Sequence, residues 1–237
     1  MENISNKVAL ITGGTKGIGY GVAESLMKEN IKVAITGRSK ASADEAAGKL
    51  NSAGKGEAVG FAADVRKLAD QQKVVDAIIK KWGQLDVLVA NAGLGYFGSI
   101  ETLTEEQWKE TIDTNLTGVF NSVKASLEAL KKTQGYIITM ASLAGINFFA
   151  GATAYNASKF GLVGFTQALM LDIRNYGVKV TTILPGSVAT NFNNNQPSER
   201  DAWKIQPEDL GQIVVDLLKM NPRTLPSKIE VRPSIPK

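Results

Sequence analysis

The sequence places Tyr155 and Lys159 four residues apart, in the run Tyr155-Asn156-Ala157-Ser158-Lys159. On a helix, side chains with this spacing share one face. A free phenol has a pKa of about 10, which is too high for efficient proton transfer near neutral pH. A nearby ammonium favours the phenolate and lowers that pKa, so the pair is suited to acid–base catalysis. The alternative is structural: an isolated pair of this kind is usually a tyrosine ring packed on a lysine stem.

The chain contains no histidine and no cysteine. Without cysteine, disulfides, thiolate nucleophiles and cysteine–zinc sites are excluded. Without histidine, the commonest general base, the Ser-His-Asp arrangement and the commonest metal ligand are absent. Proton transfer must therefore depend on Tyr, Lys, Asp or Glu, and we predict no metal site. This restriction favours the catalytic interpretation of Tyr155 and Lys159.

A second candidate site lies in the stretch from Val8 to Gly19, which reads VALITGGTKGIG. It begins as a buried strand, turns through glycines and becomes helical from Gly17 onward. The N–H groups and the dipole at such a helix N-terminus favour an anion, here a pyrophosphate. The spacing is Gly-x-x-x-Gly-x-Gly rather than the common Gly-x-Gly-x-x-Gly. A glycine-rich turn without a ligand is the alternative interpretation.

Strand-like and helix-like patterns alternate along the chain, which predicts an α/β protein with a doubly wound, mostly parallel sheet and helices on both faces. We expect a single-domain Rossmann fold over residues 1–237. A Thr104-Glu105-Glu106-Gln107 capping box predicts the start of a long helix. The expected strands are 8–12, 32–36, 58–63, 85–90, 136–141, 178–184 and an edge strand at 227–231; the expected helices begin at 17 and cover 41–51, 68–82, 104–130, 153–176 and 207–220.

In open α/β sheets, ligands bind at the carboxyl ends of the strands. Lys16 lies inside the glycine loop and Arg38 follows the second strand, where the adenosine ribose of a dinucleotide would lie. An NAD site would carry an acid there, whereas two cations suit a 2′-phosphate. We therefore predict NADP(H) as the cofactor, although either cation alone could be ordinary surface charge.

The rest of the composition is that of an ordinary globular protein, with 43% apolar and 21% charged residues. The net charge of +4 is mild, and the lysine pairs at 80–81 and 131–132 lie at expected helix ends, so we predict no nucleic-acid partner. The polar N-terminus and short apolar runs favour a cytoplasmic protein with no membrane segment. Residues 187–206 lack periodicity and predict a substrate lid.

Taken together, these motifs resemble the short-chain dehydrogenase/reductase family, in its short single-domain branch. The resemblance covers roughly residues 5–190. The motifs follow the order of the family: Thr12-Gly13-x-x-x-Gly17-Ile18-Gly19, Asp64-Val65, Asn91-Ala92-Gly93, Asn115, Ser142, Tyr155-x-x-x-Lys159 and Pro185-Gly186 through Thr190.

The resemblance implies a role for each matching residue. Tyr155 would protonate a carbonyl oxygen as NADPH delivers hydride, and Lys159 would lower the pKa of Tyr155 and bind the nicotinamide ribose. Ser142 would hold the substrate oxygen, and Asn115 would keep a water in place for a proton relay. By themselves, Ser142 could be a small residue at a strand end and Asn115 could be satisfied by backbone.

The same resemblance implies a set of cofactor-binding residues. They divide into the pyrophosphate and adenosine end, the adenine pocket, the ribose and the nicotinamide. In chain order they are Gly13, Thr15, Lys16, Gly17, Ile18, Gly19, Arg38, Ser39, Asp64, Val65, Asn91, Ala92, Gly93, Tyr155, Lys159, Pro185, Gly186, Val188 and Thr190.

The substrate is left open between several classes. Aromatic and apolar residues near the strand ends favour an apolar or aromatic ketone; they are Leu94, Tyr96, Phe97, Ile146, Phe148, Phe192 and Trp203. Arg200 and Lys204 could instead bind a carboxylate or an acidic carrier protein. The function is therefore predicted as an NADPH-dependent carbonyl reductase or alcohol dehydrogenase, with 3-oxoacyl-[acyl-carrier-protein] reductase and short hydroxy-acid dehydrogenase as alternatives.

Two other classes are more distant: a non-catalytic NADP-binding sensor, and a nucleotide-linked isomerase or dehydratase. The family also implies a homo-oligomer, a dimer or tetramer packed through the helices at 104–130 and 153–176. The chain departs from its relatives at Ala90, where many carry asparagine, in a short lid and in a proline-rich C-terminus. These departures leave the substrate and the oligomer interface in doubt.

Overall fold

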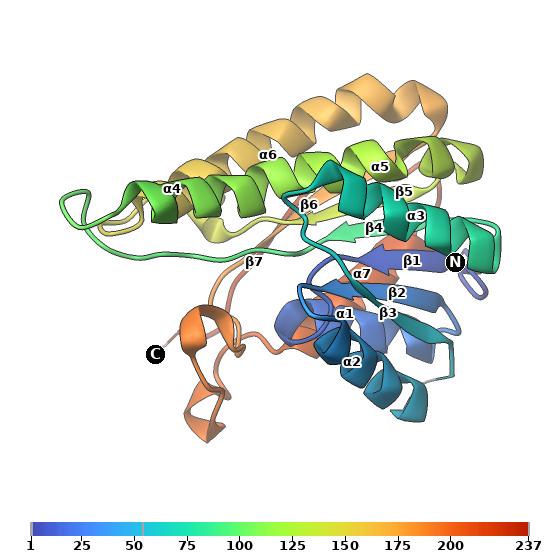
Figure 1. The fold of residues 1–237 in the computed structure, drawn as a ribbon, viewed down its shortest axis with the longest axis horizontal. Helices are drawn as coiled ribbons and strands as arrows, with labels where there is room; N and C mark the ends of the chain where they lie inside the picture. Colours follow the sequence, from blue (N-terminus) through green and yellow to red (C-terminus); the bar gives the residue numbers. More distant parts are fainter. Residues whose placement is uncertain (1, 54, 237) are drawn as a thin grey trace.

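The computed structural model describes residues 2–53 and 55–236 and contains one sheet of seven parallel strands (Figure 1). Strands and helices alternate along the chain, as the sequence predicts. The principal elements are β1 (Val8–Ile11), α1 (Gly17–Lys28), β2 (Lys32–Gly37), α2 (Lys40–Ala53), β3 (Ala58–Ala62), α3 (Leu68–Trp82), β4 (Val87–Ala90), α4 (Glu105–Ile112), α5 (Gly118–Thr133), β5 (Tyr136–Met140), α6 (Thr153–Ile173), β6 (Lys179–Pro185), α7 (Pro207–Lys219) and β7 (Lys228–Val231).

The strand order is β3-β2-β1-β4-β5-β6-β7. The chain moves outward from β1 to β3 and then returns to the other side of β1, so the order reverses between β1 and β4. A crevice opens at the carboxyl ends of the strands on either side of such a reversal. The predicted doubly wound α/β fold is confirmed, and so is the edge strand at the C-terminal end of the chain.

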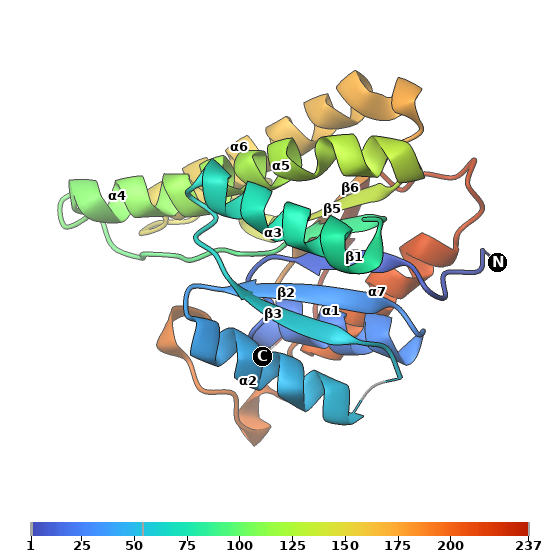
Figure 2. The ribbon, with the colours of Figure 1, turned by 45° about the vertical axis from the view of Figure 1, so that its right-hand side comes forward.

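Helices cover both faces of the sheet (Figures 1 and 2). On one face, α1, α2 and α7 bury apolar side chains of β1, β2 and β5. On the other, α3, α5 and α6 form a second apolar layer. Every residue of β1, β4 and β5 is buried, because these central strands are covered on both sides. The sheet is therefore a rigid base for the loops at its carboxyl edge.

The long helix expected from Thr104 begins there, with both hydrogen bonds of the capping box present. It is interrupted by a π-helical turn, η1 (Asp113–Thr117), which joins α4 to α5. The sequence does not predict this interruption, because the i+3 and i+4 spacing of apolar residues continues on both sides of a single wide turn. It places Asn115 at the wide turn, facing the carboxyl end of β4.

The predicted lid at 187–206 leaves the sheet after β6 and returns to it before α7. Its two ends are held together, since Ala189 N donates to Ile205 O over 2.9 Å and Ile205 N donates to Ser187 O over 3.1 Å. Two short 3-10 turns lie between, at Phe192–Asn194 and Glu199–Asp201. In the described part of the chain, none of the helices has the length and apolarity needed to cross a bilayer.

Candidate active site

Tyr155 lies in the first turn of α6, and Lys159 lies one turn later on the same face. The Lys159 ammonium is 5.7 Å from the centre of the Tyr155 ring. It is almost fully buried, with 4% of the residue exposed, and it donates a hydrogen bond of 3.1 Å to Met140 O at the end of β5. The face shared by the two side chains therefore points at the carboxyl edge of the sheet.

Burial shifts both pKa values. It raises the pKa of Tyr155, and a contact with the Ser142 hydroxyl offsets part of that rise. It lowers the pKa of Lys159 to about 8. The sequence predicts that Lys159 lowers the pKa of Tyr155, but in the folded chain the net shift is upward, because desolvation opposes the phenolate. Tyr155 is consequently a protonated phenol at neutral pH, the form needed to donate a proton.

Ser142 follows β5 and caps the short 3-10 turn Leu143–Gly145. Its hydroxyl oxygen accepts a hydrogen bond of 3.1 Å from Ala144 N. This bond uses a lone pair of the oxygen, so the hydroxyl hydrogen stays available to donate. Ser142 and Tyr155, 13 positions apart in the sequence, are thus brought into contact.

Asn115 ties three segments together. Its amide exchanges two hydrogen bonds of 2.8 Å with the backbone of Leu94, in the loop after β4, and donates a third of 3.0 Å to the Ser158 hydroxyl on α6. The side chain is fully buried. A Cβ atom on Gly93 would lie 3.2 Å from Asn115 Oδ1 and 3.7 Å from Lys159 Nζ. The site therefore brings Asn115 close to the ammonium, and its side chain acts as a backbone anchor.

The glycine loop and the end of β4 meet at the reversal point of the sheet. The buried Thr12 hydroxyl accepts hydrogen bonds from Asn91 N and Ala92 N, at 3.0 and 3.1 Å. In return the Asn91 amide donates to Thr12 O and Gly13 O. Gly13 adopts a left-handed φ of 64°, and a Cβ there would be 2.9 Å from Ala92 Cα. Only glycine allows this approach.

The glycine loop also fits a dinucleotide pyrophosphate. Gly17 has a left-handed φ of 57°, and a Cβ on it would meet nothing nearer than Thr190, at 3.4 Å. The missing side chain leaves space between the first turn of α1 and the segment after β6. Gly19 instead packs tightly, since its Cβ would lie 2.5 Å from Asn91 Nδ2. Gly17 therefore leaves space for a pyrophosphate in this glycine loop, which we call the cradle, and Gly19 allows α1 to pack closely against Asn91.

The cations predicted to read a 2′-phosphate lie at the surface beside this cradle. Lys16 precedes α1 and Arg38 follows β2, and both are exposed, as is Ser39. Within residues 2–53 and 55–236, neither cation forms an ion pair with an acid. Thr15 approaches the second strand, its methyl group 2.6 Å from the position of a Cβ on Gly37. This contact brings the glycine loop to the carboxyl end of β2.

The predicted adenine end contains an ion-pair chain that the sequence did not reveal. Both oxygens of Asp64 accept hydrogen bonds from the Arg66 guanidinium, at 2.7 to 3.0 Å, which lowers the pKa of Asp64. Arg66 also reaches Glu110 on α4 at 3.6 Å, and Glu110 accepts a hydrogen bond of 2.7 Å from Tyr96. Val65, which follows Asp64 in the sequence, is buried, and its backbone carbonyl accepts a hydrogen bond from the side-chain amide of Asn121 on α5.

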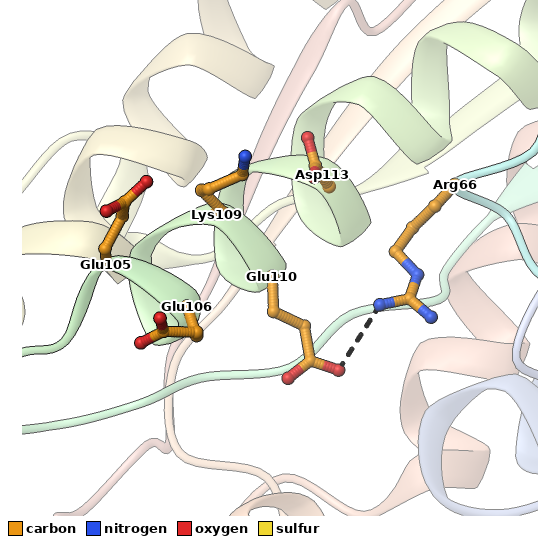
Figure 3. Close-up of a pocket in the computed structure, with 6 residues that line it drawn as sticks. All are labelled: Arg66, Glu105, Glu106, Lys109, Glu110 and Asp113. Carbon is orange, nitrogen blue, oxygen red and sulfur yellow. Dashed lines mark ion pairs between the residues drawn. The ribbon is translucent and has the colours of Figure 1, made fainter.

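Figure 3 shows Glu110 turned toward Arg66 in a groove along α4. The groove is lined by charged side chains and includes no residue predicted for catalysis or cofactor binding; its lining residues are Arg66, Glu105, Glu106, Lys109, Glu110 and Asp113. Four acids and two bases line this groove, which leaves it net negative and unsuited to the phosphates of a dinucleotide. We place the candidate active site at Tyr155 rather than here.

Aromatic rings surround Tyr155. Phe97 lies 5.3 Å and Phe192 lies 5.8 Å from it, measured between ring centres, and Phe149 packs on Phe97 at 6.2 Å. Of the predicted pocket residues, Phe97 and Phe192 are thus brought to the site. The structure places others elsewhere: the Tyr96 hydroxyl is bonded to Glu110, Ile146 packs on the core, and Lys204 lies over Trp203. Phe148 is 86% exposed and, among the described residues, pairs with no aromatic ring, so it is not part of the site either.

The remaining predicted cofactor residues lie at the same edge. Ile18 is in the first turn of α1, and Pro185 ends β6. Gly186 N donates to Val231 O on β7, and Val188 pairs with Ile205. The carboxyl edge of one sheet therefore gathers the glycine loop, the strand ends and the pair on α6.

Comparisons with known proteins agree with this geometry. Residues 7–201 match the family model described as short chain dehydrogenase. The chain belongs to the short-chain dehydrogenase/reductase family. It is an oxidoreductase of that family, as its matching relatives are. Among these is the 3-oxoacyl-[acyl-carrier-protein] reductase of Vibrio cholerae, which is 36% identical over 191 residues, 80% of this chain and 77% of that protein.

Two solved structures match nearly the whole chain. An alcohol dehydrogenase from the archaeon Thermococcus sibiricus, complexed with 5-hydroxy-NADP, has a TM-score of 0.92 at 28% identity and covers 98% of this chain and 99% of its own. A 3-ketoacyl-(acyl-carrier-protein) reductase from Brucella melitensis, complexed with NADH, has a TM-score of 0.88 at 28% identity, with 97% and 98% covered.

Sequence reasoning missed several residues that build this site. Asn156 holds the loop before α6, accepting from Phe149 N and donating to Ala144 O and Asn147 O. A polar residue directly after Tyr155, on a helix with an apolar face, is the signal that could have revealed it. Phe149 and Arg66 carried no such signal, because their contacts come from distant segments.

The pKa of Lys159 predicts a pH dependence of stability. The folded chain holds this amine at about 8 instead of its ordinary 10.5, so between these values the unfolded chain binds more protons and stability rises with pH. We expect the free energy of unfolding to rise between pH 8 and pH 10 by about 2 kcal/mol more than in Lys159→Met. Urea unfolding at both pH values measures this, and identical pH slopes would contradict a buried ammonium.

Proposed function

We propose that this short-chain dehydrogenase/reductase is an NADPH-dependent carbonyl reductase, or an alcohol dehydrogenase in the reverse direction. The observation that carries the proposal is the contact of the protonated Tyr155 with the Ser142 hydroxyl, with the buried Lys159 ammonium 5.7 Å from the centre of the Tyr155 ring. This trio faces the same sheet edge as the glycine cradle. A proton donor and the proposed seat for a dinucleotide thus lie at one edge of the sheet, which is the arrangement that reduction of a carbonyl requires.

In the proposed mechanism, NADPH bound in the cradle supplies the hydride. Tyr155 donates its phenolic proton to the carbonyl oxygen, so that one hydride and one proton convert C=O to CH–OH. The Ser142 hydroxyl donates a hydrogen bond to the same oxygen and holds it against Tyr155. Lys159 stabilises the phenolate left behind. Asn115 positions the loop after β4 through Leu94, and so fixes the floor of the site.

NADPH is proposed in preference to NADH on the basis of charge. Lys16 and Arg38 flank the expected adenosine ribose, and no acid follows β2 where one would accept from a 2′-hydroxyl. The Thermococcus alcohol dehydrogenase is bound to an NADP derivative, which supports this assignment, whereas the Brucella reductase is bound to NADH. Relatives of this fold thus bind either type of cofactor, and the proposal of NADPH rests on the cations Lys16 and Arg38.

A carbonyl panel tests the proposed function. We expect oxidation of NADPH at 340 nm with at least one of an aryl diketone, an aliphatic diketone, a keto acid and a 3-oxoacyl thioester. Arg38→Asp should reverse the cofactor preference, lowering kcat/KM for NADPH at least tenfold while NADH is retained, because the acid repels the 2′-phosphate. Lys80→Asp, at an exposed position near the C-terminal end of α3, is the charge-matched control. A failure of all carbonyls, or an unchanged preference in Arg38→Asp, would contradict the proposal.

Reduction of 3-oxoacyl thioesters on a carrier protein is the second candidate, supported by the names of the Vibrio and Brucella relatives. The predicted carrier contact is weakened, because Lys204 pairs with Asp201 at 2.6 Å. Arg200 is left as the exposed cation of that segment. A short hydroxy-acid dehydrogenase would need a cation for the substrate carboxylate. The groups found around the Tyr155 ring are Phe97, Phe192 and the buried Lys159, whose ammonium is bonded to Met140 O. A non-catalytic sensor is disfavoured by the presence of Ser142, Tyr155 and Lys159 together.

We also propose a homo-oligomer packed through α4, α5 and α6, which lie side by side on one face (Figures 1 and 2). Large apolar side chains are exposed on these helices, namely Trp108, Phe120, Phe160 and Leu171. Exposed apolar patches of this kind mark interaction sites. We expect a dimer or tetramer in sedimentation equilibrium, and a monomer at micromolar concentration would contradict this. The lid at 187–206, the single domain and the cytoplasmic location remain predictions.

A further inference from the structure

Three phenylalanine rings from three separate segments meet around Tyr155. Phe97 comes from the loop after β4, Phe149 from the segment before α6, and Phe192 from the predicted lid. Phe97 and Phe192 contact each other edge to face, with ring centres 6.4 Å apart, and both contact Tyr155. All these separations lie in the range of favourable aromatic pairs. We call Phe97, Phe149 and Phe192 the aromatic wall.

The backbone is arranged to bring these rings together. A Cβ on Gly95 would lie 3.0 Å from both Phe97 and Phe192, so only a residue without a side chain leaves room for the two rings. Gly98 N donates to Gly151 O over 2.8 Å, which joins the Phe97 loop to the segment before α6. The Phe149 backbone is held by Asn156.

The wall is nevertheless open to solvent. Phe97 is 43%, Phe149 53% and Phe192 38% exposed. A folded chain gains by burying such rings, and a cluster of exposed ones beside a proton donor is typical of a ligand site. The aromatic wall itself carries no charge. Of the two cations of the predicted lid, Lys204 is paired with Asp201 and Arg200 is exposed. A flat apolar group would gain contact there, whereas a carboxylate would lose water without gaining a cation.

We propose that the aromatic wall selects substrates that carry an aryl or similar flat apolar group next to the carbonyl. This inference rests on the proposed function, since it places the carbonyl at Tyr155. The aryl group would pack against these rings while Tyr155 and Ser142 hold the oxygen. Phe97, Phe149 and Phe192 are therefore specificity-determining residues, and small aliphatic ketones, keto acids and acyl thioesters are poorer substrates.

The test compares two diketones that differ only in one group, 1-phenyl-1,2-propanedione and 2,3-butanedione. We expect the native protein to reduce the phenyl compound with at least tenfold higher kcat/KM, the discrimination that an apolar pocket commonly provides. Phe97→Ala, Phe149→Ala and Phe192→Ala should each lower kcat/KM for the phenyl compound about tenfold, mainly through KM, and change that for butanedione less than about threefold.

Phe148→Ala is the matched control. Phe148 is adjacent to Phe149, is 86% exposed and, within the described residues, contacts none of the rings of the wall. This variant should change kcat/KM for neither diketone by more than about twofold, as is usual for an exposed position away from special features. A second measurement, saturation-transfer NMR with 1-phenylethanol, reports binding without turnover; its signal should persist in Phe148→Ala and be lost in a Phe97→Ala/Phe192→Ala double variant.

The outcomes separate the two proposals. Turnover of a thioester or of butanedione with no phenyl preference would overturn the wall and leave the proposed function standing. An equal loss for both diketones in the three variants would also overturn the wall, because the rings would then have only a structural role. Saturation transfer that depends on the wall, without turnover of any carbonyl, would support the wall and overturn the proposed function.

Discussion

The buried ammonium of Lys159 is the constraint on which the rest of the site depends. Removing a charge from water is costly, and here a single backbone carbonyl, Met140 O, is the hydrogen-bond partner found for it. That carbonyl lies at the end of β5, a strand covered on both faces, so the sheet fixes the point at which the ammonium is held. Tyr155, one helical turn earlier, is positioned as a consequence.

The surrounding hydrogen bonds keep this arrangement from relaxing. Asn115 connects the loop after β4 with α6, and Asn156 connects α6 with the loop after β5. Thr12 and Asn91 close the opposite side, where the glycine loop meets β4. Buried amides bonded this completely are rigid, because any displacement would leave a polar group without a partner. The identity of the aromatic side chains on the surrounding loops can then vary while Tyr155, the proton donor, stays in place.

Much of the fold followed from local signals in the sequence. Apolar runs bounded by turns gave the strands, the capping box located the start of α4, and α3 spans the expected residues 68–82. The glycines at 13, 17 and 19 indicated the cradle because each is needed by the backbone. The Tyr155–Lys159 spacing gave the shared helix face without any tertiary information.

What the sequence could not supply depends on contacts between distant segments. The pKa of Tyr155 rises because neighbouring segments exclude water from it, and burial of that kind is not encoded in spacing. The Asp64–Arg66–Glu110 chain joins the loop after β3 to α4, and Phe149 reaches the site through Asn156. The π-helical turn at Asn115 is likewise set by what the helix packs against. Local sequence patterns predict helices and strands, whereas these features arise only when distant segments meet at the carboxyl edge of the sheet.

The central claim is that Tyr155 is the proton donor and not merely part of the binding surface. The most direct measurement is kcat of Tyr155→Phe with the best carbonyl substrate, together with its dissociation constant for NADPH by fluorescence titration. We expect kcat to fall about 10³-fold, within the range that general acid catalysis provides, while the dissociation constant changes less than about threefold. Turnover within tenfold of the native protein, with intact cofactor binding, would contradict the account.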